Sequence, residues 1–227
     1  MEHWLCHKIY EACFARSIRP LIYTTEYDRG GFDIAVGVET TIREFQLKVM
    51  AGNASTREWK ISSTLLWPRI DMLDAFCILS EGNAYAGRMG GVILMEVSAD
   101  DNHITKVDLF YCDIAVLAFR YLRNGPDDQA ARQLYEIFQR PLSLNAESNR
   151  GRIPISKACF IRLPSVASVL NLAGLPLDNM LSFRHMVRQS FRPILTNRDY
   201  NTREPGEHWY PLEALEANFL RISSVDN

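Results

Sequence analysis

The stretch GGFDIAVGVETTIREFQLKVM, from Gly30 to Met50, constrains the fold of this 227-residue chain more than any other segment. Apolar residues alternate with polar or small ones on either side of Glu39 and Thr40. A period of two residues indicates a strand, and two such runs joined by a tight turn indicate a β-hairpin. The segment therefore predicts paired antiparallel strands with a turn near Glu39 and Thr40.

Polar side chains share one face of the second predicted strand, where Glu44, Gln46 and Lys48 recur at every second position. The turn places Asp33 opposite Gln46 or Lys48 at one edge of the sheet. Mg²⁺ binds oxygen ligands and keeps several waters, and Asp33 and Gln46 offer a charged and a neutral oxygen. Lys48 is suited to orient a bound water or to stabilise charge on a phosphate. The alternative is that these side chains only face the solvent.

A third carboxylate would complete a metal site, and Glu11 is placed to supply it. Residues 2–17 carry apolar residues at a helical period, and this helix immediately precedes the predicted strands. A competing arrangement uses Glu58 and Lys60, although the residues before them are typical of a turn. If the run EWKIS is the strand that faces Asp33, the site moves to Glu58 and Lys60.

The rest of the chain predicts an α/β (α+β) fold with a helical C-terminal part. Two more strand patterns, GVILMEVS and KVDLFY, follow the hairpin. Asp113 is a candidate N-cap of the next helix, Gly125 a candidate end, and a second helix runs to Pro141. We expect a core over residues 1–140, a polar linker over 141–152, and a helical basic region over 153–227.

The combination of helix-borne Glu11, Asp33 after two glycines, and Gln46-Leu47-Lys48 resembles the PD-(D/E)XK nuclease superfamily, in its QxK variant. The resemblance covers residues 5–50 and extends loosely to 111. It departs from the pattern at Phe32, where the motif has proline, and at Gln46, where it has an acid. It implies a restriction-endonuclease-like mixed sheet flanked by helices, with Asp33, Gln46 and Glu11 as metal ligands.

The same resemblance implies an activity and partners. The expected reaction is Mg²⁺- or Mn²⁺-dependent hydrolysis of phosphodiester bonds in DNA, with RNA as an open alternative, by a homodimer acting in restriction or phage defence. Two other hypotheses remain open. One is a catalytically inactive nucleic-acid-binding or assembly protein on the same scaffold, and the other is a stand-alone interaction module.

Charge is distributed unevenly along the chain. The window from Arg150 to Arg203 holds nine Lys and Arg residues but only two acids, although the whole chain has a net charge of −2. The runs SVASVLNLAG and DNMLSFRHMVRQSFRPIL resemble a helix-turn-helix, with Ser165 and Asp178 as caps. We expect an outer basic face for nucleic acid, formed by Arg184, Arg188 and Arg192 together with Arg150 and Arg152. The alternative is an ordinary helical hairpin with solvated arginines.

The remaining composition indicates a cytoplasmic protein. The five cysteines lie mostly within apolar runs and lack the spacing of a disulfide framework or zinc site, so we expect buried free thiols. No apolar run is long enough to span a bilayer, and the charged N-terminal segment has no secretory h-region.

Overall fold

A computed structural model describes most of the chain. Residues 26–30, 67–89, 101–102, 126, 140–151, 176, 178–182, 197–209 and 224–227 lie outside the description, as do the side chains of 63, 64, 135, 137–139, 188 and 191–196. The predicted linker therefore falls almost wholly outside the described residues, as do Arg150, Asp178 and Cys77.

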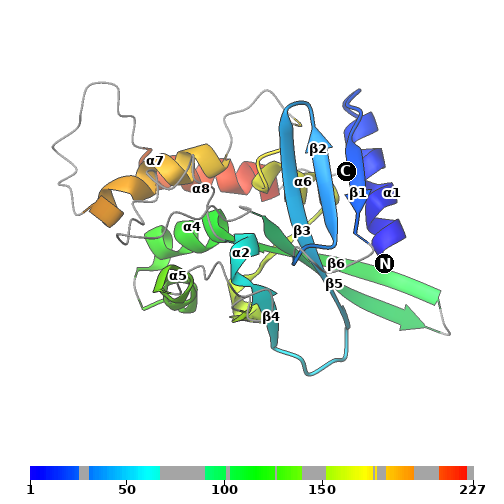
Figure 1. Ribbon diagram of the computed structural model, residues 1–227, viewed down its shortest axis with the longest axis horizontal. Helices are drawn as coiled ribbons and strands as arrows, with labels where there is room; N and C mark the ends of the chain where they lie inside the picture. Colours follow the sequence, from blue (N-terminus) through cyan, green and yellow to red (C-terminus); the bar gives the residue numbers. More distant parts are fainter. Residues whose placement is uncertain are drawn as a thin grey trace.

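A six-stranded mixed sheet forms the centre of the protein (Figure 1). In spatial order its strands are β1 (Leu21–Thr24), β2 (Ile34–Val38), β3 (Thr41–Ala51), β5 (Gly91–Asp100), β6 (His103–Asp113) and β8 (Ile161–Leu163). β3 and β5 pair in parallel, and the other neighbours pair antiparallel. A separate two-stranded sheet joins β4 (Glu58–Ser62) to β7 (Arg152–Ser156).

The described helices are α1 (Glu2–Phe14), α2 (Ser63–Leu66), α4 (Ile114–Asn124), α5 (Gln129–Gln139), η1 (Lys157–Cys159, a 3₁₀ turn), α6 (Val166–Leu172), α7 (Phe183–Thr196) and α8 (Leu212–Ser223). The predicted α+β fold class is confirmed. None of the described helices is both long enough and apolar enough to cross a bilayer.

The predicted hairpin is confirmed by β2 and β3. Their pairing runs from Ile34 opposite Phe45 to Val38 opposite Thr41, so the turn consists of Glu39 and Thr40. Glu39 has a φ of +52°, the positive value that tight hairpin turns require. The N-terminal helix is also confirmed, because α1 buries residues of its predicted apolar face at an i, i+4 spacing, such as Leu5 and Ile9.

The sheet has two faces of different character. Directly paired residues of neighbouring strands point to the same side, so the register assigns each side chain to a face. The hairpin face carries Gln46, Lys48, Glu96 and Asp108, with Asp33 at its margin. The α1 face carries Phe45, Val49, Met95, Leu109 and Tyr111. In Figure 1, α1 and α6 lie together behind β1–β3, and these two helices pack against each other.

The C-terminal region joins the core rather than forming a wholly helical appendage. Its first residues form β7, which pairs with β4, and β8, which extends the main sheet beyond β6. Neither strand was predicted from the sequence, because both are short and only a 3₁₀ turn separates them. The helix predicted after Ser165 is confirmed: the Ser165 hydroxyl accepts from the Ser168 N–H, and Gly174 follows the helix with a φ of +74°.

Gly91 makes room for the ring of Tyr111 beneath it. A Cβ at Gly91 would lie 2.5 Å from ring atoms of Tyr111, a completely buried residue whose hydroxyl is hydrogen-bonded to Asp113. Gly91→Ala should therefore lower the free energy of unfolding by about 1–3 kcal/mol, the range for overpacked cores. Urea denaturation of the two proteins measures this difference.

Gly37→Ala is the matched control, because its added Cβ would meet its nearest neighbours at an ordinary 3.5 Å. We expect it to change the free energy of unfolding by less than about 1 kcal/mol. Equal losses for the two variants would show that strand glycine itself, rather than the fit against Tyr111, sets the stability.

Candidate functional site

Asp33 is fixed at the open end of the β2–β3 pair. Its backbone N–H donates to the Phe45 carbonyl at 2.8 Å, which continues the register and sets Asp33 opposite Gln46. The Asp33 Oδ2 atom accepts a 2.5 Å hydrogen bond from the Leu47 backbone N–H. Because Leu47 lies between Gln46 and Lys48, this bond holds the carboxylate at the level of those two residues.

Gln46 is buried, not solvated. Only 6% of the residue is exposed, and its Oε1 atom has no hydrogen-bond partner among the described residues. The alternative in which Gln46 faces the solvent is therefore wrong. Its neighbour on β5 is the buried Val92, which offers no polar side-chain atom. A buried carbonyl oxygen without a partner destabilises a fold by about 1–3 kcal/mol, and such atoms often mark the place of an ion or water.

Lys48 is half-buried on the same face of the sheet as Gln46. The chain segment that precedes Asp33 runs close to β4. Gly31 has a φ of +72°, and a Cβ there would lie 2.7 Å from the Cβ of Ser62. The end of β4 therefore abuts the segment that leads into Asp33. The structure thus brings Asp33, Gln46 and Lys48 to one corner of the hairpin face.

Glu11 does not join this corner. It lines a groove of about 540 Å³ together with Val107 and Leu109, and these residues lie on the α1 face. The sheet therefore separates Glu11 from the hairpin residues. Its carboxylate is paired on its own helix, with Lys8 at 2.7 Å and His7 at 2.9 Å. The hydrogen bond from Lys8 lowers the pKa of the Glu11 carboxyl below its usual value.

The competing pair, Glu58 and Lys60, lies on a strand of the smaller sheet. The residues before Glu58 form a turn and irregular chain, as expected, and the run EWKIS is β4, which pairs with β7 and not with the strands next to Asp33. Glu58 stands opposite Ser156 and Lys60 opposite Pro154, and both are exposed. Only the end of β4, at Ser62, reaches the hairpin corner.

Glu44 is a carboxylate that the choice of site residues left out. It shares the hairpin face with Gln46, two positions along β3, and stands opposite Ala35. Glu44 takes part in interactions of its own. The alternation of the sequence places Glu44 with Gln46 and Lys48, whereas the predicted site took its third carboxylate from the N-terminal helix, at Glu11.

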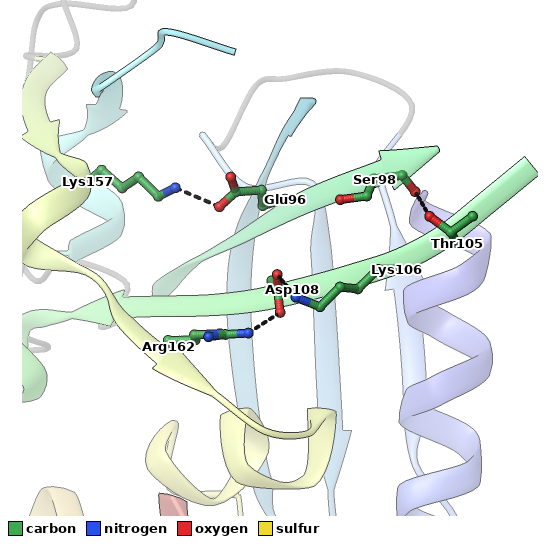
Figure 2. Close-up of polar contacts among 7 residues, drawn as sticks. All are labelled: Glu96, Ser98, Thr105, Lys106, Asp108, Lys157 and Arg162. Atoms are coloured by element: carbon green, nitrogen blue, oxygen red, sulfur yellow. Dashed lines mark hydrogen bonds and ion pairs between the residues drawn. The ribbon is translucent and has the colours of Figure 1, made fainter. Parts of the chain in front are cut away.

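A second polar cluster occupies the hairpin face farther from the turn (Figure 2). Glu96 and Asp108 are direct cross-strand partners, which brings two like charges together. Lys157 pairs with Glu96 at 2.6 Å, while Lys106 and Arg162 pair with Asp108 at 2.7 and 2.6 Å. The Lys106 hydrogen bond lowers the pKa of Asp108, against a smaller opposing effect of burial. These side-chain cations already neutralise the carboxylates. The cluster therefore links neighbouring segments of the chain and is not a site for a metal cation.

The predicted nucleic-acid face loses one of its arginines. Arg184 is only 3% exposed, and its guanidinium lies 3.1 Å from the buried Asp113 carboxylate and 3.0 Å from the Ala173 carbonyl. The expectation that Arg184 lines an outer face is therefore wrong, because the helix turns this position toward the core. Arg152 is exposed on β7, opposite Ser62. The side chains of Arg188 and Arg192 lie outside the described part.

Among the described residues, no three or more His, Cys, Asp or Glu side chains gather as a metal-binding group. Four of the cysteines are free: Cys13, Cys112 and Cys159 are buried, and Cys6 is partly buried. No protein-family model, no curated protein and no solved structure matches this chain.

The buried position of Arg184 predicts a structural effect of its removal. Arg184→Ala leaves the Asp113 carboxylate buried without its counter-ion, which should lower the free energy of unfolding by about 3–5 kcal/mol. Chemical denaturation followed by circular dichroism measures this loss.

Arg162→Ala is the matched control, since it removes an exposed arginine that pairs with Asp108. Exposed pairs contribute about 0–1 kcal/mol, so this variant should unfold close to the wild type. If Arg184→Ala kept full stability, the buried ion pair would not contribute as its geometry indicates.

Proposed function

We propose that this chain is a metal-dependent endonuclease that hydrolyses phosphodiester bonds of nucleic acid at the Asp33–Gln46–Lys48 corner. The observation that carries the proposal is the buried Gln46 Oε1 atom. It has no hydrogen-bond partner among the described residues, and it lies on the strand whose Leu47 N–H binds the Asp33 carboxylate. The resemblance to PD-(D/E)XK nucleases, drawn from the sequence, supports the same residues.

The donor set fits a hard divalent cation. Mg²⁺ and Mn²⁺ bind carboxylate and amide oxygens, and Mg²⁺ keeps several waters of its own. The Leu47 hydrogen bond to Asp33 Oδ2 leaves acceptor capacity on that carboxylate, which has about four lone-pair sites. Asp33 and Gln46 would hold the cation, and Glu44, rather than Glu11, is the carboxylate on the same face that can add charge. The cation would supply Lewis-acid activation of water and phosphate.

The chain's own residues do the remaining work. The Leu47 N–H orients the Asp33 carboxylate, so this group needs little reorganisation when a substrate arrives. Lys48 follows Gln46 on the same face of β3, two residues along the strand. Its ammonium group would stabilise the negative charge that develops on the phosphate. The buried surroundings of Gln46 strengthen such electrostatic interactions by excluding water.

The position of Glu11 favours a second candidate function. With the helix carboxylate on the opposite face, the described residues give the corner a lower charge than a site with three acids. A catalytically inactive nucleic-acid-binding protein on the same scaffold would need only Lys48 and the basic residues of the window from Arg150 to Arg203. The two candidate functions are distinguished by whether the protein cleaves nucleic acid or only binds it.

The first test of the nuclease proposal is the removal of Asp33 and Lys48. Asp33→Ala should abolish Mg²⁺- or Mn²⁺-dependent cleavage of plasmid DNA and of single-stranded RNA, because it removes the charged oxygen of the corner. Lys48→Ala should slow cleavage by about 100-fold or more, as for other groups that stabilise developing charge. Nicking is followed on gels, and circular dichroism checks that each variant is folded.

Glu11→Ala and Lys60→Ala are the matched controls, because both remove exposed charges away from the corner. Each should cleave at the wild-type rate. An Asp33→Ala protein that cut as fast as the wild type would refute the site. A folded wild type that binds nucleic acid but cuts neither substrate would instead favour the binding protein.

The second test concerns Gln46 and the cation alone. Gln46→Glu adds a charge and should raise the affinity for Mn²⁺. Gln46→Leu removes the amide oxygen and should weaken Mn²⁺ binding while raising stability, by about 1–3 kcal/mol if the penalty of the buried oxygen is recovered. Calorimetric titration with Mn²⁺ and thermal unfolding without metal give the two readouts. Unchanged Mn²⁺ affinity in Gln46→Leu would mean that Gln46 is not a ligand.

A further inference from the structure

Exposed apolar side chains gather along one edge of the main sheet. On β1, Leu21 and Tyr23 are 60% and 55% exposed, and on β3 Ile42 is 53% exposed. A Cβ at Gly37 would touch Leu21 on one side and Ile42 on the other, at 3.5 and 3.6 Å. These side chains therefore stand on the same face, around a bare glycine.

β1 is an edge strand, and its own residues do not protect it. It begins the strand order of the sheet, so within the described part of the chain only β2 pairs with it. Edge strands normally carry charges, proline or a bulge that prevent pairing with another chain. The strand Leu-Ile-Tyr-Thr has none of these.

The edge is complementary to itself. If two copies of β1 pair antiparallel about a two-fold axis at Ile22, Leu21 of each copy stands opposite Tyr23 of the other. Both pairs then lie on the face that carries Ile42, and aromatic-aliphatic cross-strand pairs of this kind are favourable. A two-fold interface requires such a self-complementary patch.

We propose that β1 is a homodimer interface, at which two copies of this chain join their sheets by antiparallel pairing of β1. The backbone groups of the edge become paired, and the exposed residues Leu21 and Tyr23 gain cross-strand partners from the other copy. The two-fold axis runs perpendicular to the joined sheet, so the hairpin faces of both copies point to the same side.

A consequence that rests on the proposed function follows for the substrate. The two β2 strands, each of which begins directly after an Asp33, lie three strand spacings apart, or about 14 Å across the strands. Both candidate sites would therefore face one nucleic acid molecule, as double-strand cleavage requires. The dimer itself does not depend on this consequence.

The experiment places charged side chains of one sign or the other at the proposed β1 interface. In one variant Leu21 and Tyr23 are both replaced by lysine, and in the other both are replaced by glutamate. Each variant alone places like charges opposite each other and should be monomeric, with a dissociation constant weakened about 100-fold or more. An equimolar mixture should form a heterodimer, because opposite charges then meet. Sedimentation velocity over about two orders of magnitude in concentration measures association without nucleic acid.

Ile104→Lys and Leu220→Lys are the matched controls, because they replace apolar residues of similar exposure, 53% and 63%, on β6 and α8. Both should dimerise like the wild type, and so should Asp33→Ala, so that failure of the nuclease proposal leaves this test intact. A wild type that stays monomeric at every concentration would overturn the proposal. So would charged variants that dimerise alone, or a mixture that does not associate.

Discussion

The buried carboxylate of Asp113 is the interaction on which the arrangement of the other elements depends. It accepts a hydrogen bond from the Tyr111 hydroxyl at 2.7 Å and one from the Val116 N–H at 2.8 Å, and it pairs with Arg184 at 3.1 Å. One carboxylate thus stands at the end of β6, caps the start of α4 and holds α7 through its ion pair with Arg184. Because an unpaired charge in the interior is very unfavourable, these elements have to come together for the chain to fold.

The same network reaches the strand that carries the candidate site. Arg184 donates to the Ala173 carbonyl at the end of α6, and Arg43 of β3 donates to the same oxygen at 2.8 Å. Burial, followed by the adjacent Asp113 charge, raises the pKa of Tyr111 well above its usual value, so Tyr111 keeps the proton that it donates. β3 is therefore fixed from the α1 face, while Gln46 and Lys48 remain on the opposite side. A rigid strand is a suitable support for a site whose groups need a fixed separation.

The local parts of this arrangement were predictable from the sequence, and the distant partners were not. The alternation around Glu39, the helical period of α1 and the cap at Asp113 depend on residues close in sequence. β7 and β8 were missed because three- and five-residue strands have too few positions to show a period. Arg184 was assigned to the solvent because an arginine on an amphipathic helix is normally exposed, and nothing near it in sequence reveals Asp113. The face on which α1 packs, and hence the position of Glu11, is likewise a tertiary property.

Gln46 shows where stability and the proposed function oppose each other. A strand position opposite the buried Val92 would be most stable with an apolar side chain. β3 places an amide there, and its oxygen has no hydrogen-bond partner in the described part of the chain. Local choices in a natural sequence normally agree with the fold, and exceptions concentrate at functional sites. The neighbouring Asp33 carboxylate is not an exception of this kind, because the Leu47 N–H stabilises it in the absence of any ligand. Asp33 alone would therefore be compatible with a purely structural hairpin. The Gln46 oxygen, which has no hydrogen-bond partner among the described residues, is the feature of this corner that a purely structural hairpin does not require.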